Sequence, residues 1–272
     1  MTTWTSNTIE ANGLRLHYTR TGGDKPPLVL AHGITDDGLC WTPVAEVLAP
    51  EYDVIMVDAR GHGRSAAPEH GYGSAEQAED LAAIIAALKL HKPIILGHSM
   101  GAVTTLVLAG TGPDVPRAIL LEDPPASWSS HPVDGVGDAD WRAGMRAWIT
   151  GLQGQKREAL IAAQRSETPG WSEAELEPWA EAKLRFSLNV LNPSPVVAID
   201  WPATLQRITC PTLLITADQS LGALLSEEEV AKLREWVPHL QVTPIPQAGH
   251  SIRRDQFARY IEAVRNFLTS LP

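Results

Sequence analysis

The sequence predicts an α/β protein: a mostly parallel, doubly wound sheet with helices on both faces and an inserted helical cap. Short apolar runs alternate with amphipathic helical patterns, as expected when helices cover both faces of a sheet. One long stretch late in the chain breaks this alternation and is helical throughout. A serine between two glycines stands where a predicted strand meets a predicted helix. The first two features predict the fold, and the third directs attention to one site.

The predicted strands are short, mostly apolar runs bounded by glycine, proline or polar residues. Runs of this kind are typical of strands that are covered on both faces. They span residues 28–31, 54–57, 93–96, 118–121, 212–215 and 240–245.

Apolar residues at helical spacing predict helices between these strands. Leu81, Ile84 and Leu88 share one face of a helix, and Ser74 and Gln77 before them have capping-box spacing. A last helix is expected over residues 257–268. The same capping-box spacing predicts two more helix starts, one at Ser172 with Glu175 and one at Ser226 with Glu229.

Residues 124–203 lack a convincing buried strand and contain six of the nine tryptophans. An insertion of this length usually lies at the carboxyl ends of the strands, where α/β proteins bind ligands. We therefore expect a core made of residues 1–123 and 204–272, with 124–203 as a helical cap over a pocket. The expected cap helices span residues 140–152, 155–165 and 172–191.

The composition excludes several classes of protein. The 272 residues carry a formal charge of −10, which disfavours a nucleic-acid partner. The longest apolar run, residues 81–88, is far shorter than the roughly 20 residues of a membrane span, and the N-terminus does not resemble a secretory signal. Cys40 and Cys210 make neither a disulfide framework nor a zinc site. We expect a cytoplasmic monomer or homodimer without membrane association or bound metal.

The strongest chemical signal is Gly97-His98-Ser99-Met100-Gly101. A serine in Gly-x-Ser-x-Gly at a strand-to-helix turn is a nucleophile elbow, in which the tight turn excludes flanking side chains and exposes the hydroxyl. The next backbone N–H, that of Met100, then lies at a helix N-terminus, where developing negative charge is stabilised.

A serine nucleophile needs a base and an acid that orients the base. In elbow folds the order along the chain is serine, acid, histidine, which selects His250 in the loop after the last predicted strand. Asp218, after the strand 212–215, is the preferred acid. Asp123 and Glu122 are the alternatives, because they follow the strand 118–121 at the same edge of the sheet.

These residues resemble the α/β-hydrolase superfamily, in its branch of small esterases, lactonases, C–C bond hydrolases and cofactor-free haloperoxidases. The resemblance spans nearly the whole chain and rests on His32-Gly33, Asp58–Ser65, Ser99, Asp218 and Gly249-His250. The loop of the expected acid departs from the usual Gly-x-Asp pattern, because Ala217 directly precedes the aspartate.

The resemblance implies an oxyanion hole made by the N–H groups of Ile34 and Met100, and a reaction that needs no cofactor. It also implies that His32, His98 and the segment 58–65 are scaffold. Ser99 at the elbow argues against the dehalogenases and epoxide hydrolases of this fold, which use an aspartate there. We expect His62 and the pair Arg253-Arg254 to be solvated.

The predicted substrate is a small to medium carboxylic ester with an apolar acyl group. Trp128, Trp141 and Trp148 of the insertion and Trp41 near the elbow are the expected pocket residues. An N-acyl homoserine lactone or another lactone is an alternative substrate, and C–C bond hydrolysis is an alternative reaction. A receptor for small molecules that retains the triad is the alternative from a different class.

Overall fold

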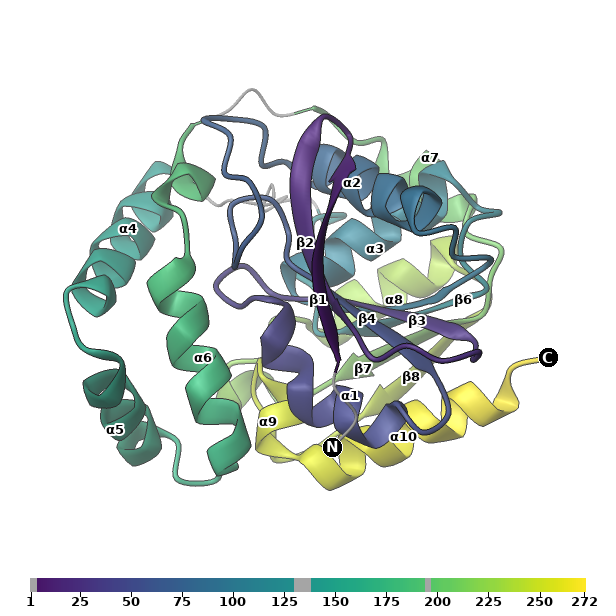
Figure 1. Ribbon diagram of the computed structural model, residues 1–272. Coiled ribbons are helices and arrows are strands. Elements are labelled where there is room, and N and C mark those ends of the chain that lie inside the picture. Colours follow the sequence, from purple (N-terminus) through teal and green to yellow (C-terminus); the bar gives the residue numbers. More distant parts are fainter. Residues whose placement is uncertain (1–3, 130–137, 194–196) are drawn as a thin grey trace.

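The computed structural model describes residues 4–129, 138–193 and 197–272. Their centre is an eight-stranded sheet in the order β1-β2-β4-β3-β5-β6-β7-β8. Strands β3 to β8 run parallel, whereas β1 and β2 form an antiparallel hairpin at one edge. The predicted α/β class with a mostly parallel sheet is therefore confirmed (Figure 1).

All six predicted strands occur, with bounds that differ from the expected ones by one or two residues. They are β3 (Pro27–Ala31), β4 (Asp53–Val57), β5 (Ile94–His98), β6 (Ala118–Glu122), β7 (Thr212–Thr216) and β8 (Leu240–Pro244). The apolar runs did not predict β1 (Thr5–Ala11) and β2 (Leu14–Arg20). The turn Asn12-Gly13 joins these two strands, with φ angles of 50° and 71°, a conformation that favours Asn-Gly in hairpins.

Helices cover both faces of the sheet, and alternate residues of each strand point to opposite layers. Val29 of β3 packs in the hydrophobic cluster with α2, α3, α7 and α8, whereas Leu28 and Leu30 pack in the cluster with α1, α9 and α10. Figure 1 shows the two layers on either side of the sheet. The helices are α1 (Thr42–Leu48), α2 (Ser74–Ala87), α3 (Met100–Thr111), α7 (Trp201–Gln206), α8 (Glu227–Trp236), α9 (Ile252–Asp255) and α10 (Phe257–Ser270).

The predicted cap helices form a separate group beside the sheet (Figure 1). They are α4 (Ala139–Gln153), α5 (Arg157–Glu167) and α6 (Glu173–Arg185), followed by the 3-10 turn η2 (Leu188–Leu191). The expected helix over 172–191 is shorter, because Phe186 has an extended backbone and ends α6. Helix α6 contacts α1 and the 3-10 turn η1 (Gly38–Trp41) of the core.

The predicted capping boxes have mixed outcomes. Ser226 and Glu229 cap α8 reciprocally, as expected. The prediction at Ser74 is wrong, because Gly73 is the N-cap of α2 and makes no side-chain bond. Ser172 precedes α6 without a side-chain capping hydrogen bond. The N–H of Glu175 donates to the backbone carbonyl of Ser172, and the Glu175 carboxylate accepts from Arg254.

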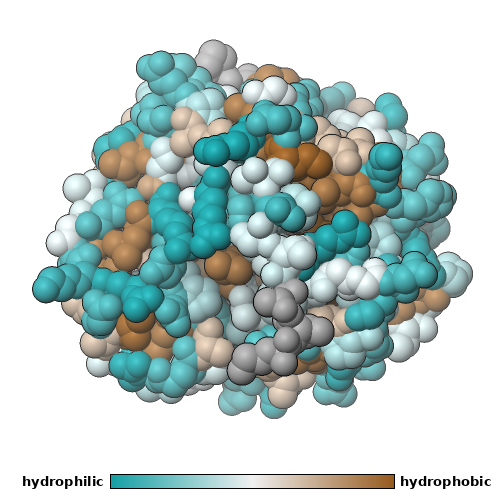
Figure 2. All heavy atoms as spheres, in the orientation of Figure 1, coloured by the Kyte–Doolittle hydropathy of each residue, from teal (hydrophilic) through white to brown (hydrophobic). Residues whose placement is uncertain are grey.

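Hydrophobic side chains form separate patches among hydrophilic ones on the face shown in Figure 2. Among the described residues, no helix is long and apolar enough to cross a membrane.

Candidate active site

The nucleophile elbow has the geometry that its sequence predicts. Ser99 lies between β5 and α3 with φ 52° and ψ −117°, a strained conformation for a residue with a side chain. A Cβ atom on Gly97 would overlap the carbonyl oxygen of Gly101, and one on Gly101 would overlap that of Ala31. Both glycines are therefore required for the tight packing that exposes the Ser99 hydroxyl.

Three side chains form a continuous hydrogen-bonded chain at the elbow. The Nε2 atom of His250 lies 3.0 Å from the Ser99 hydroxyl oxygen. The other ring nitrogen, Nδ1, lies 2.7 Å from a carboxylate oxygen of Asp123. Asp123 is fully buried, whereas about one third of the His250 side chain is exposed. The arrangement has the geometry of a nucleophile, a base and an orienting acid.

The preference for Asp218 as the partner of His250 is wrong in this structure, and the alternative Asp123 occupies that place. The Asp218 carboxylate accepts a hydrogen bond from the backbone N–H of Gln247 at 2.8 Å, and its own N–H donates to the carbonyl of Ala248. Asp218 therefore ties the loop after β7 to the loop that carries His250, without touching the imidazole.

Sheet order explains why Asp123 reaches His250. Strand β6 is the direct neighbour of β5, and His98 pairs in register with Glu122, so Ser99 and Asp123 leave the sheet side by side. Asp123 has a left-handed φ of 40°, and both of its carboxylate oxygens accept from the N–H of Leu224, at 3.1 and 2.9 Å. The hydrogen bonds from Leu224 thus hold the carboxylate in the position from which it contacts His250.

Ile34 and Met100, the expected oxyanion-hole residues, both line the cavity that Ser99 faces. Met100 is the first residue of α3, so its N–H is among those left unpaired at the helix N-terminus. The carbonyl oxygen of Ile34 lies 2.5 Å from Nε2 of His62, which fixes that loop. His62 is buried, so the expectation that it is solvated is wrong. The two oxyanion donors stay a prediction.

His98 contacts His250 through its ring and through a hydrogen bond to the backbone. Its Nε2 atom donates to the carbonyl oxygen of His250 at 3.0 Å, and the two ring centroids are 4.7 Å apart. Burial, together with the nearby Arg253 and His250, holds the pKa of His98 well below its usual value. His98 is therefore neutral near pH 7 and orients His250 through its backbone.

A cavity of about 600 Å³ opens on Ser99 and His250. Trp141 and Trp148 of α4 line it, as the sequence predicts, and keep 38% and 44% of their surfaces exposed. Trp171 and Trp179 also line it but were not singled out in advance. Their position in the tryptophan-rich insertion was the only signal available.

Two expected pocket tryptophans belong to the core instead. Trp41 is completely buried, and the guanidinium carbon of Arg253 lies 4.4 Å from the centroid of its ring. Trp128 packs edge-on against Trp201, and its indole N–H donates to the carbonyl oxygen of Glu229 at 3.2 Å. Neither residue lines the cavity. Both rings are instead part of the hydrophobic clusters that flank the sheet.

A cluster of buried charges joins the cap to the core beside the cavity. One carboxylate oxygen of Asp36 accepts hydrogen bonds from Arg253 and Arg254, at 2.8 and 3.0 Å, and the other lies 3.1 Å from the ammonium nitrogen of Lys183. The expectation that Arg253 and Arg254 are solvated is wrong, because 0% and 6% of their surfaces are exposed.

Two glutamates complete this cluster. Glu122 accepts from the backbone N–H of Arg253 at 2.9 Å and pairs with its guanidinium at 3.3 Å. Glu175 of α6 accepts from Nε of Arg254 at 3.0 Å. Glu122, the second alternative for the acid, therefore anchors the helix that follows His250 and does not contact the imidazole. Paired in this way, the buried charges avoid the large penalty of isolated ones.

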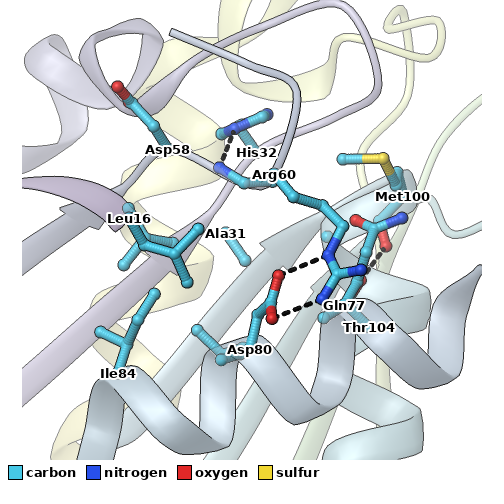
Figure 3. Close-up of a pocket in the computed structure, with 14 residues that line it drawn as sticks. Leu16, Ala31, His32, Asp58, Arg60, Gln77, Asp80, Ile84, Met100 and Thr104 are labelled. Carbon is cyan, nitrogen blue, oxygen red and sulfur yellow. Dashed lines mark hydrogen bonds and ion pairs between the residues drawn. The ribbon is translucent and has the colours of Figure 1, made fainter. Parts of the chain in front are cut away.

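A second, much smaller cavity lies behind the elbow (Figure 3). Its volume is about 30 Å³, enough for one or two water molecules but too little for an acyl group. Arg60 and Asp80 form a two-point ion pair on its wall, with two N–O distances of 2.6 Å. This pair fastens the segment 58–65 to α2. The larger cavity is therefore the candidate substrate site.

Comparison with known proteins places this geometry in a family. Residues 26–253 match the family model described as alpha/beta hydrolase fold. The chain is 31% identical over 267 residues to the N-formylmaleamate deformylase of Pseudomonas putida, covering 96% of this chain and 95% of that protein. It is 27% identical over 259 residues to the 2-(acetamidomethylene)succinate hydrolase of Mesorhizobium japonicum, covering 92% and 90% of the two chains.

A solved structure agrees with this assignment. The N-formylmaleamic acid deformylase from Pseudomonas putida S16 superimposes with a TM-score of 0.77 and 26% identity, over 96% of this chain and all of that one. The match of the family model and the similarity over almost the full length are sufficient for the assignment. The chain belongs to the α/β-hydrolase family.

Proposed function

We propose that the protein is a serine hydrolase that cleaves carboxylic esters through an acyl-enzyme intermediate. The observation that carries the proposal is the hydrogen-bonded chain Ser99–His250–Asp123 at the mouth of a mostly apolar cavity. This arrangement supplies the nucleophile, the base and the orienting acid that acyl transfer requires.

The proposed reaction has two halves. The Ser99 oxygen attacks the substrate carbonyl while Nε2 of His250 takes the hydroxyl proton, and Asp123 stabilises the resulting imidazolium through Nδ1. The N–H groups of Ile34 and Met100 hold the tetrahedral oxyanion, at about 3–4 kcal/mol for each donor. His250 then protonates the leaving alkoxide. Water, deprotonated by His250, attacks the acyl group and releases the acid, which regenerates Ser99.

The cavity favours small to medium apolar acyl groups. Its wall includes four tryptophan rings and the side chains of Met100, Val103 and Met145. Each methylene buried against such a wall contributes about 0.8 kcal/mol, so binding strengthens with acyl length until the cavity is full. A cyclic ester would open by the same steps, because its ring oxygen is the leaving group.

Hydrolysis of an activated amide is the second candidate reaction. The names of two relatives, a deformylase of N-formylmaleamate and a hydrolase of 2-(acetamidomethylene)succinate, describe substrates with an N-acyl group. The same triad would serve, except that His250 must protonate a leaving nitrogen, which is a poorer leaving group than an alkoxide. Two substrates that differ only in the leaving atom therefore separate the candidates.

The first experiment labels the nucleophile with a fluorophosphonate. We expect one covalent adduct per chain, on Ser99, and its complete loss in Ser99→Ala. The exposed Ser166 on α5 provides the matched control, since Ser166→Ala should label like the wild type. Active protein that fails to label, or that labels at another residue, would contradict the proposal.

The second experiment compares p-nitrophenyl butyrate with N-(4-nitrophenyl)butanamide, which share the acyl chain and the nitrophenyl ring. Ester turnover at least 10³-fold faster than amide turnover supports the ester assignment. Comparable rates, or a preference for an N-formyl amide over the matched formate ester, would make the amide reaction the function of this site.

A further inference from the structure

Two buried cations lie on the wall of the catalytic cavity, and the proposed reaction does not use them. Lys183 of α6 and Arg254 of α9 both line the cavity, with only 2% and 6% of their surfaces exposed. They come from the cap and from the core, respectively, and Asp36 bridges them. Both cations are paired with carboxylates, so their burial alone needs no further explanation; what calls for one is the hydrogen-bonding capacity that this pairing leaves unused.

These two cations have more hydrogen-bond donors than the described residues satisfy. The Lys183 ammonium donates to the carbonyl of Thr35 and to Asp36, at 2.7 and 3.1 Å, which leaves one of its three N–H groups. Arg254 uses Nε for Glu175 and Nη2 for Asp36. Its Nη1 amino group has no acceptor in the described parts of the chain.

The neighbouring carboxylates are already committed. Asp36 is shared among Lys183, Arg253 and Arg254. Glu229, which also lines the cavity, accepts from the N–H and hydroxyl of Ser226 at 2.8 and 2.9 Å as the cap of α8. Within the described parts of the chain, the remaining donors of the two cations therefore have no acceptor, and a bound ligand can supply one.

The aromatic rings beside the two cations indicate which charge a ligand group at this wall should carry. The Lys183 nitrogen lies 5.2 Å from the centroid of the Trp179 ring, and the Arg254 guanidinium lies 4.9 Å from that of Trp171. Ring faces that already hold a cation are poor sites for a second one. This wall therefore suits an anionic group and disfavours an ammonium group.

The effect of this wall on a carboxylate is visible at Asp36. Burial by itself would raise the pKa of Asp36, but the neighbouring Arg254, Lys183 and Arg253 hold it well below its ordinary value. A carboxylate placed against the same cations is thus kept ionised in an otherwise apolar cavity.

We propose that Lys183 and Arg254 form a carboxylate-binding subsite within the catalytic cavity. The substrate then carries a carboxylate in addition to the acyl group that is cleaved, while its apolar body lies against Trp141 and Trp148. The choice of substrate rests on the proposed function, whereas binding of the carboxylate does not. Charge-assisted hydrogen bonds from both cations would fix the orientation of the substrate.

An acid and its isosteric amide test the subsite directly. Isothermal titration of the wild-type protein with 3-phenylpropionate and with 3-phenylpropanamide compares two ligands of one shape that differ in charge. We expect the acid to bind at least tenfold more tightly, and to slow fluorophosphonate labelling of Ser99 in proportion to its occupancy. Equal affinities, or tight binding of the acid that leaves labelling unaffected, would overturn the proposal.

Two matched variants test whether Lys183 is responsible for the preference for the acid over the amide. Lys183→Met keeps the length of the side chain but removes its charge, and should reduce the acid-to-amide ratio to threefold or less. Lys232→Met is the control: Lys232 also lies over an indole ring, that of Trp236, but outside the cavity. A ratio that stays at the wild-type value in Lys183→Met would remove Lys183 from the subsite.

The comparison of acid and amide binding to the wild-type protein remains decisive even where Lys183→Met folds poorly. Lys183→Arg then serves as the second variant, because it retains the positive charge and should retain the preference for the acid.

The subsite and the proposed function can fail separately. A protein that prefers the acid but never labels at Ser99 has the subsite without the hydrolase. A protein that labels and turns over esters but binds acid and amide equally is a hydrolase without it.

Discussion

The two helical walls of the cavity that opens on Ser99 are built in opposite ways. Helix α6 is joined to the core by buried ion pairs, since Lys183 bonds to Asp36 and Glu175 bonds to Arg254. Helix α4 has a single buried residue, Ile149, and presents two half-exposed tryptophans. Both helices belong to the group of helices beside the sheet (Figure 1).

This difference separates two tasks within one cap. The α6 wall is held by contacts that fix distances, so it suits the positioning of a charged group beside the triad. The α4 wall is tied to residues 183–192 by hydrogen bonds from Arg146 and Gln153, but it presents half-exposed apolar area to the cavity. We therefore expect it to suit acyl chains of variable length. Substitutions on α6 should therefore affect folding and orientation, whereas those on α4 should affect the choice of acyl chain.

The largest expected effect concerns the proposed triad, the hydrogen-bonded chain Ser99–His250–Asp123. Asp123→Asn should lower kcat by about 10⁴-fold, because the amide favours the wrong imidazole tautomer. Asp218→Asn, the matched substitution on the neighbouring loop, should keep kcat within about tenfold and act mainly by lowering Tm, since Asp218 holds the backbone of Gln247. Measuring kcat of both variants on one ester decides which aspartate orients His250. The reverse ranking would return the acid to the loop after β7.

The mistaken preference for Asp218 as the partner of His250 shows what the sequence alone does not determine. Ser99 and His250 were predictable because each is marked by its own local pattern. The acid depends on which strand lies beside β5, and the spacing along the chain does not contain that information. The altered motif at Ala217 was a signal in the right direction, because a loop that departs from the family pattern need not keep the family role.

The missed elements have equally physical reasons. Strand β1 escaped detection because most of it is exposed, and β2 because its buried residues include the polar His17 and Thr19, so neither has an apolar run. The turn Asn12-Gly13 was the usable signal. Arg253 and Arg254 were expected at the surface because their partners, Asp36, Glu122 and Glu175, are distant in sequence. Long-range charge pairing has no local pattern.

The second prediction concerns the ion pairs that join helix α6 to the core. Glu175→Gln should destabilise the protein by about 3 kcal/mol, because it leaves the buried Arg254 with one carboxylate partner fewer. For a chain of this size, that corresponds to a fall in Tm of roughly 5–10 °C. Glu173→Gln on the same helix is the control, since the Glu173 pair with Arg165 is exposed and should leave Tm nearly unchanged. Similar Tm values for the two variants would show that α6 is not anchored by charge.

The third prediction uses pH to examine the far end of the same wall, where Arg185 of α6 lies 3.5 Å from Asp37. Burial, and then the nearby charge of Asp58, raise the pKa of Asp37 to about 7. The folded protein therefore retains a proton that the unfolded chain has lost above about pH 4, so stability falls as pH rises from 4 to 7.

Asp37→Asn cannot ionise and should escape this loss. Relative to the wild type, its free energy of unfolding should increase across the same window by on the order of 2–4 kcal/mol, and the difference should be constant above about pH 8. Urea titrations at several pH values measure it. A difference that is independent of pH, or that shrinks as pH rises, would show that Asp37 is ionised in the folded protein.

The smallest expected effect concerns the α4 wall and tests its independence from α6. Trp148→Ala removes half-exposed apolar area from the cavity, so the longer acyl chains lose contacts that acetate never makes. At about 0.8 kcal/mol per buried methylene, loss of one or two such contacts corresponds to a fall of roughly fourfold to fifteenfold in kcat/KM for the octanoate ester. The kcat/KM for the acetate ester should stay within about twofold of the wild-type value, and Tm should change little.

Trp179→Ala on α6 removes a largely buried ring beside Lys183, so it should instead lower Tm and reduce activity on both esters together. The ratio of octanoate to acetate kcat/KM in the two variants measures the contrast directly. If that ratio is unchanged in Trp148→Ala, or falls as far in Trp179→Ala, the two walls do not divide their tasks and chain-length selectivity belongs to the cap as a whole.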